Sequence, residues 1–360
     1  MKKLIQFELM KIIRKRLTLF GVIVVLALSA LYSYSTYHNM YAFDGAGREG
    51  TGRTAVEIDK DIAAKYAGIL TDEKVRQMLN DFTPKSIDNM FGMNAIYLYQ
   101  NAIQSAVYAR FSDRDGNWNG LRVSDVFGEE EIKIGYINGW LQTSQNMIRI
   151  FLVLAFVIII MNAPVYASEY DGVDNIIFTS KYGKTKCAAA KAAAGILSAL
   201  FITFIVSLIN ILFALVLYGT EGLDCSILFA QLTMAERYIP YNITCGTLLI
   251  YQILLAFTGA VSVAGITLLL SALCRNQIMA LVSSAAVYIS PMMLPISENN
   301  PLFKWIVLLP LYHAQFISLM SVKQMKNGLL YAVWAILAAG IIVAVGVILS
   351  RRIFARHEVL

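Results

Sequence analysis

The stretch AAAGILSALFITFIVSLINILFALVLYGT, residues Ala192–Thr220, contains no charged side chain. A helix needs about 20 apolar residues to cross the roughly 30 Å hydrocarbon core of a bilayer. The stretch is long enough for that, and its length and uniform apolarity are not those of a strand or of a short buried helix. It therefore predicts a membrane-spanning helix.

The composition of the whole chain agrees with this prediction. Of its 360 residues, 58% are hydrophobic and 15% are charged, whereas a soluble protein carries about 25% charged residues. A disordered protein, a fibrous protein and an ordinary soluble enzyme are thereby excluded. Another uncharged stretch, Asn89–Ala109, is too polar to face lipid. The seven strongly apolar uncharged stretches are Leu17–Phe43, Ile150–Ser168, Ala192–Thr220, Tyr238–Cys274, Asn276–Ser297, Trp305–Val322 and Asn327–Ser350.

Trp305–Val322 is the doubtful stretch, because Pro310, His313 and Gln315 interrupt it. With six spans, most basic residues of the short connecting segments fall on the side that holds both termini, and the positive-inside rule makes that side cytoplasmic. A seventh span would move Arg351, Arg352 and Arg356 outside. We therefore expect an outer re-entrant hairpin near residues 301–322, with a seventh span as the alternative.

The expected fold is an all-α integral membrane protein with about six transmembrane helices. An N-terminal amphipathic elbow helix and a helical extracellular domain between spans one and two complete it. The expected segments are a cytoplasmic amphipathic helix (1–16), the first transmembrane helix (17–34), the extracellular domain (35–146), five further transmembrane helices (147–350) with a cytoplasmic coupling loop (168–187), and a cytoplasmic tail (351–360).

The segment 35–146 is the only one that is both long and polar enough to fold outside the membrane. Long loops are translocated largely regardless of charge, so its basic residues do not oppose an outer position. Its apolar residues recur at helical spacing, and Thr71 is a plausible N-cap for the second of two stripes. These stripes are Ile58, Ile62 and Tyr66, then Val75, Met78 and Leu79.

The first sixteen residues predict a helix on the inner membrane surface. Its apolar stripe is formed by Ile5, Leu9, Ile12 and Ile13. The basic residues Lys11, Arg14 and Lys15 lie opposite or beside the stripe, where they would approach anionic headgroups. The alternative is a basic flank that only orients the first span.

The inner loop after the second span begins with Ser168 and Asp171, which resemble a capping box, and then carries an apolar triplet. A short connection between spans needs no such device, so we expect another protein to dock there. The alternative is that the triplet dips into the headgroup region.

One apparent site in the chain fails on its spacing. Gly183-Lys184-Thr185 resembles the tail of a phosphate-binding loop, but Phe178 stands where that loop needs glycine. No pattern of metal-binding or catalytic residues is present, so we expect no enzyme activity, no cofactor and no nucleic acid as a partner. Cys225 and Cys245 flank one outer loop, which leaves open either a disulfide or two buried free thiols.

Together these features resemble the permease subunits of type-two ATP-binding-cassette (ABC) exporters. The similarity rests on the elbow helix, the large outer domain, the motifs Glu169-x-x-Gly172 and Ser180-x-x-Gly183-Lys184, and the segment Leu268–Asn276 after the fourth span. The coupling interface that the resemblance implies comprises Glu169, Asp171, Gly172, Ile176, Ile177, Phe178, Tyr182 and Lys184.

The resemblance further implies an exporter in the bacterial plasma membrane that moves an amphiphilic molecule such as a peptide or an antibiotic. Two copies of a separate ATPase subunit would bind ATP and Mg, and a second permease, identical or a sister subunit, would complete the complex. The alternative is a membrane sensor whose outer domain binds a ligand. A secondary transporter is disfavoured, because the spans lack ionisable residues and show no repeat symmetry.

Overall fold

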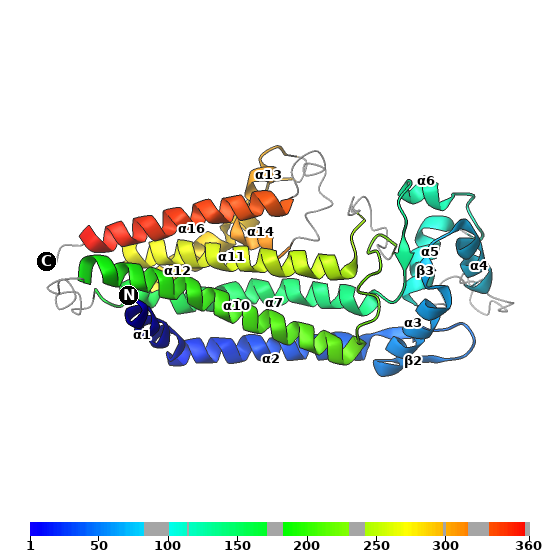
Figure 1. Cartoon of the computed structure of the whole chain (residues 1–360), viewed down its shortest axis with the longest axis horizontal. Coiled ribbons are helices and arrows are strands. Elements are labelled where there is room, and N and C mark those ends of the chain that lie inside the picture. The colour runs from blue at the N-terminus through cyan, green and yellow to red at the C-terminus, as the bar shows by residue number, and fades with distance from the viewer. Residues whose placement is uncertain are drawn as a thin grey trace. The chain divides into compact units, whose positions relative to one another are not determined.

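The computed structural model describes residues 1–82, 101–113, 115–170, 183–229, 242–297, 300–315 and 331–356. The chain divides into two compact units (Figure 1). Unit 1 comprises Met1–Ser29, Met147–Ile209 and Tyr251–Leu360, and unit 2 comprises Ala30–Asn146 and Asn210–Ile250.

Five helices in the described part of the chain are long and apolar enough to cross a membrane. They are α2 (Arg16–Asn39), α7 (Asn138–Asn162) with its continuation α8 (Pro164–Ala167), α10 (Ala188–Tyr218) with the preceding π-helical turn η2 (Gly183–Cys187), α11 (Cys245–Leu273) and α16 (Tyr331–Arg356). The expectation of an α-helical, multi-pass membrane protein is confirmed at this level.

In unit 1 these helices lie side by side, and several of their ends meet at what we call the basic end. Ser271 near the end of α11 contacts Tyr166 in α8, whose ring lies 5.0 Å from that of Phe354 near the end of α16. Helix α1 (Lys2–Ile13) and the start of α10 join them through the Glu8–Lys191 ion pair. The described basic residues at these helix ends, which define the basic end, are Lys2, Lys3, Lys11, Arg14, Lys15, Arg16, Lys186, Lys191, Arg275, Arg351, Arg352 and Arg356.

Helices α11 and α16 both run toward the basic end, so the chain after α11 must first run away from that end. Helix α12 (Gln277–Ile289), continued by the 3-10 turn η3 (Ser290–Met293), begins this segment. Ala280 packs against Ala163 and Ala167 near the start of α12, and Tyr288 packs against Phe156 further along. The helical part is shorter than the predicted span 276–297.

Two short helices follow, α13 (Phe303–Ile306) and α14 (Pro310–His313). His313 lies beside Thr258, near the middle of α11, and its Nδ1 is 3.1 Å from the Thr258 hydroxyl. Of the predicted hairpin 301–322, the part beyond Gln315 lies outside the described residues.

The close approach of α11 and α16 requires glycine. A Cβ built on Gly346 would lie 2.4 Å from the backbone oxygen of Gly265. Small residues let membrane helices approach until their backbones touch, which strengthens dispersion contacts where no hydrophobic effect drives association.

Unit 2 combines helices with two small antiparallel sheets. Strand β1 (Tyr41–Phe43) pairs with β2 (Glu49–Thr51), and β3 (Gly68–Ile69) pairs with β4 (Lys133–Ile134). The helices are α3 (Arg53–Tyr66), α4 (Asp72–Phe82), α5 (Ala102–Phe111) and α6 (Val123–Phe127). The sequence predicted the helices of this region but not its strands, because strands of two or three residues are too short to show a period of two in the sequence.

The predicted apolar stripes form the core of unit 2. In the first, Ile58 and Tyr66 are buried and Ile62 is half-buried, whereas Val75, Met78 and Leu79 of the second are all buried. The Thr71 hydroxyl accepts a hydrogen bond from the Lys74 amide at 3.2 Å, which confirms the predicted N-cap. Unit 2 also includes residues 210–250, which the prediction of a domain over 35–146 left out.

Candidate functional site: a buried ion-pair cluster

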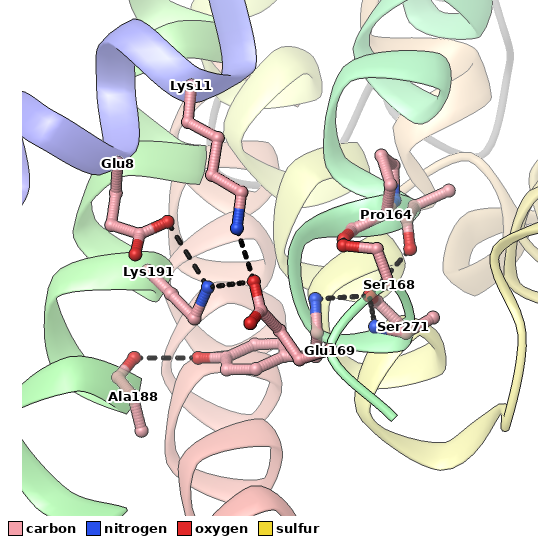
Figure 2. Close-up of polar contacts among 11 residues, drawn as sticks. Glu8, Lys11, Pro164, Ser168, Glu169, Ala188, Lys191 and Ser271 are labelled. Carbon is pink, nitrogen blue, oxygen red and sulfur yellow. Dashed lines mark hydrogen bonds and ion pairs between the residues drawn. The ribbon is translucent and has the colours of Figure 1, made fainter. Parts of the chain in front are cut away.

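Four charged side chains meet at the basic end of unit 1 (Figure 2). Glu8 and Lys11 come from α1, Glu169 follows α8, and Lys191 lies in the first turn of α10. We call these four residues the ion-pair cluster. It joins three segments that are far apart in the sequence.

Lys191 is the centre of the cluster. Its side chain is 1% exposed, and its Nζ lies 2.8 Å from Glu169 Oε1 and 3.2 Å from Glu8 Oε2. Lys11 donates to the same Oε1 atom of Glu169. The two ammonium groups and two carboxylates balance in charge, as buried ions must if their loss of hydration is to be compensated.

The electrostatics of Glu169 follow from this arrangement. Burial alone would raise the pKa of its carboxyl, but the charges of Lys191 and Lys11 and their hydrogen bonds outweigh burial and lower the pKa below its usual 4.5. The carboxylate is therefore held in its ionised form, because opposite charges at contact distance favour the charged state.

Lys15 borders the cluster in the connection between α1 and α2. Burial, followed by repulsion from Lys11 and Lys191, lowers the pKa of Lys15. Arg14 is exposed to solvent or lipid, and Lys11 keeps 40% of its side chain exposed. Of the three basic residues predicted to meet headgroups, Arg14 and the exposed part of Lys11 are free to do so, whereas Lys15 is half-buried.

Hydrogen bonds hold the segment before Glu169 in place. The Ser271 hydroxyl accepts from the amides of Tyr166 and Ala167, at 2.9 and 3.1 Å, and donates to the Ala163 carbonyl at 2.6 Å. The Tyr166 hydroxyl donates to the Ala188 carbonyl at 2.8 Å. Ser271 of α11 thus satisfies backbone groups of α8 and of the residue before it, and the Tyr166 side chain joins α8 to the start of α10.

Tyr170, the last described residue before the loop 171–182, extends this anchoring. Its hydroxyl donates to the Ala272 carbonyl at 2.9 Å, and its ring lies 6.0 Å from that of Phe354. On the other side of the loop, the π-helical turn Gly183–Cys187 leads directly into α10. Both ends of residues 171–182 are therefore attached to the same group of packed helices, which includes parts of α1, α8, α10, α11 and α16.

The predicted coupling interface falls only partly within the described residues. Glu169 is 2% exposed, and its carboxylate faces Lys11 and Lys191 of this chain. The backbone of Lys184 lies in the π-helical turn. Asp171, Gly172, Ile176, Ile177, Phe178 and Tyr182 lie outside the described residues.

Our sequence reasoning did not identify the roles of Glu8 and Lys191. Neither residue belongs to a motif: Lys191 is one of several basic residues near the start of its apolar stretch, and Glu8 is one of several charged residues in the first sixteen. A signal was present, since Lys191 is the sole charged residue of α10 and a charge within an apolar helix requires a partner. Ser271 carried no signal, because a serine in an apolar helix commonly bonds to its own backbone.

Cys225 and Cys245 lie in unit 2 as buried free thiols. The backbone amide of Cys245 donates to the Cys225 carbonyl at 3.0 Å, so the two residues are neighbours in space. Burial raises the pKa of the Cys225 thiol to about 11.

Within the described residues, no group of three or more His, Cys, Asp or Glu side chains could hold a metal ion. No protein-family model and no curated protein matches this chain.

Proposed function

We propose that this chain is the membrane-spanning permease subunit of an ABC exporter. It moves an amphiphilic molecule outward with ATP hydrolysed by a separate ATPase subunit. The observation that carries the proposal is that both ends of the loop 171–182 are attached to the same group of packed helices. A force applied to such a loop reaches several helices at once.

The orientation follows from the basic end. It collects charges from both termini and from the connections α8–α10 and α11–α12, and the positive-inside rule assigns such a surface to the cytoplasm. We propose six crossings because α11 and α16 run in the same direction, so the chain between them must cross the membrane once in the opposite direction. Helix α12 and the segment after it make this crossing. Unit 2 then lies on the extracellular side of a bacterial plasma membrane.

The coupling step needs a docking element and a rigid connection. Ile176, Ile177 and Phe178 supply the apolar anchor that inserts into the ATPase. Closure of two ATPase subunits moves the loop, and the ion-pair cluster transmits the displacement to α1 and α10. Lids and domains that close around ATP move rigid elements in this way.

The roles within the complex are divided accordingly. ATP and Mg bind to the two ATPase copies, and this chain supplies no catalytic residue. A second permease, identical or a sister subunit, completes the pathway. Helix α1 lies along the inner membrane surface as the elbow helix, with Arg14 and Lys11 directed to the headgroups.

Replacement of Phe178 with alanine tests the docking role. Truncating an interface anchor costs about 2 kcal/mol or more of binding free energy. We expect weaker co-purification of an ATPase that carries a phosphate-binding loop, and reduced transport, while the amount of permease in the membrane is unchanged. Glu169 is unsuitable for this test, because its replacement disturbs the ion-pair cluster itself.

The matched control is Phe7→Ala on α1, which removes an exposed ring from the same end of unit 1. This variant should bind the ATPase as the parent does. If Phe178→Ala binds the ATPase and transports like the parent, the loop 171–182 is not the coupling element and the exporter proposal loses its main support.

The membrane sensor remains the second candidate, because unit 2 contains a depression lined by Lys60, Lys133 and Asp224 that could receive a ligand. One measurement distinguishes the exporter from the sensor. Reconstituted permease and ATPase should show ATP-dependent movement of a substrate across the membrane only if the chain is an exporter.

A further inference from the structure

A short antiparallel pairing in unit 2 brings Cys225 and Cys245 together. Ser226 and Thr244 form a β-bridge, flanked by two backbone hydrogen bonds of 3.0 Å, from Ile227 to Ile243 and from Cys245 to Cys225. The Ser226 hydroxyl also donates to Asn242 Oδ1 at 2.7 Å. The pairing is thus supported by both backbone and side chains.

This register places the two cysteines directly opposite each other. Opposite residues of a hydrogen-bonded antiparallel pair have Cα atoms about 5.5 Å apart. Disulfides join residues whose Cα atoms are about 4.4–6.8 Å apart. The backbone pairing therefore holds Cys225 and Cys245 at a Cα separation that a disulfide can bridge.

The surroundings of the pair favour a bond that resists reduction. Cys225 is 4% exposed and Cys245 is fully buried. Gly135 leaves room for the Cys225 sulfur, since a Cβ at that position would lie 2.6 Å from it. Cys225 also lines the depression bordered by Lys133 and Asp224, which provides a route for a small oxidant.

We propose that Cys225 and Cys245 close to a disulfide by thiol–disulfide exchange with an oxidant that itself carries a disulfide. The Cys225 thiolate attacks one oxidant sulfur and expels the other as a thiolate, giving a mixed disulfide. The Cys245 thiolate then attacks the Cys225 sulfur and expels the second oxidant thiolate. Both protons pass to the released thiolates, so that two cysteines are oxidised and one oxidant disulfide is reduced to two thiols.

The bond ties the first residue of α11 to the segment after α10. That segment is itself fixed to unit 2, because the Ser226 amide donates to the Lys133 carbonyl at 2.8 Å and Arg110 donates to the carbonyl of Phe229 at 3.0 Å. The disulfide thus joins the start of α11 covalently to a segment that is bonded to the body of unit 2. Its formation does not depend on ATPase coupling.

Peptide mapping of the full-length protein tests the proposal. The protein is purified without reductant, unfolded, alkylated with iodoacetamide, digested and analysed by mass spectrometry. We expect a cross-linked peptide containing Cys225 and Cys245. Cys187 and Cys274, which lie in unit 1 and share no strand pairing, are the internal controls and should be alkylated.

A second measurement covers protein that is purified in the reduced state. Reduced protein is incubated with oxidised glutathione and mapped again, and the same cross-linked peptide should appear. Closing a loop of this size predicts a rise in melting temperature of about 5 °C or more. The rise should be absent in Cys225→Ser and in Cys245→Ala, and retained in Cys187→Ser. If Cys225 and Cys245 remain alkylated after this incubation, the proposal is overturned.

Discussion

Lys191 is a lysine that the fold has removed almost completely from water. Its ammonium group keeps its charge because Glu8 and Glu169 replace the lost hydration with two ion pairs. Breaking a buried pair by removing one partner is costly, since the remaining ion is then left without compensation. The cluster therefore makes the position of α1 depend on side chains of α10 and of the segment after α8.

The Lys191→Met variant tests this dependence. Methionine keeps an unbranched chain but leaves the Glu8 carboxylate without its ammonium partner, and the expected loss of unfolding free energy is about 3–5 kcal/mol. The melting temperature in detergent should fall by about 5 °C or more.

Two controls distinguish lost charge pairing from general damage. The double variant Lys191→Met with Glu8→Gln should recover part of the loss, because the unpaired carboxylate is also gone. Arg14→Met changes an exposed base of the same α1 region and should melt within about 1 °C of the parent. A Lys191→Met protein that melts like the parent would contradict the stabilising role of the cluster.

The pKa of Glu169 predicts a specific pH dependence. Because that pKa is lowered below 4.5 in the folded protein, the cluster contributes fully above pH 4.5 and its contribution is lost as the pH falls through the lowered value. The melting temperatures of the parent and of Glu169→Gln should differ by a constant amount from about pH 5 to 7 and converge in stronger acid. If the difference in melting temperature grew on acidification, the direction assigned to the pKa shift of Glu169 would be wrong.

At the scale of single elements, the contact between α11 and α16 depends on the absence of side chains. Gly346 meets the Gly265 backbone, whereas a Cβ on Gly340, earlier on α16, would meet nothing within 4 Å. The same substitution at these two positions therefore separates packing from helix propensity.

We expect Gly346→Ala to destabilise the protein by about 1–3 kcal/mol, because the added methyl group forces the two backbones apart. Gly340→Ala should be neutral or stabilise by up to about 1 kcal/mol, since alanine is the better helix former. Thermal unfolding of both variants in the same detergent provides the measurement. Equal effects at both positions would show that the close contact is not important for stability.

The elements also show which patterns a sequence reveals. Helices α3 and α4 were predictable because their buried residues recur every three or four positions and because Thr71 caps α4. The pairing of β3 with β4 was not predictable, since it joins two-residue strands separated by more than sixty residues of chain. The shortened α12 was hidden by the apolar residues that continue after Met293, because hydropathy does not record where a helix ends.

At the scale of the whole molecule, the basic end gives the chain an orientation that can be tested. A reporter after Leu360 should be inaccessible to an impermeant reagent in intact cells, and one inserted within Thr71–Asp81 should be accessible. The physical reason is that the residues of the basic end lie with both termini in unit 1, whereas residues 71–81 belong to unit 2. A labelled C-terminal reporter would mean that residues 305–322 cross the membrane.

The candidate site was predictable in location but not in its contacts. The composition of residues 168–187 marked that loop as unusual, and Glu169 lies at its edge. Glu169 contacts Lys191, which is 22 residues away in the sequence, and Lys11, which is 158 residues away. These contacts depend on distant segments that the fold brings together. No local pattern encodes such pairing, because each partner is only one charge among several nearby.

The order in which the cluster residues occur along the chain has a consequence for biosynthesis. Glu8 and Glu169 both precede Lys191, so a ribosome delivers both carboxylates before the helix that carries the buried ammonium group has emerged. Chains fold from the N-terminus during synthesis. Helix α10 can therefore be inserted with its single charge passing directly to waiting counter-ions, and the bilayer need not accommodate an unpaired lysine at any stage of translation.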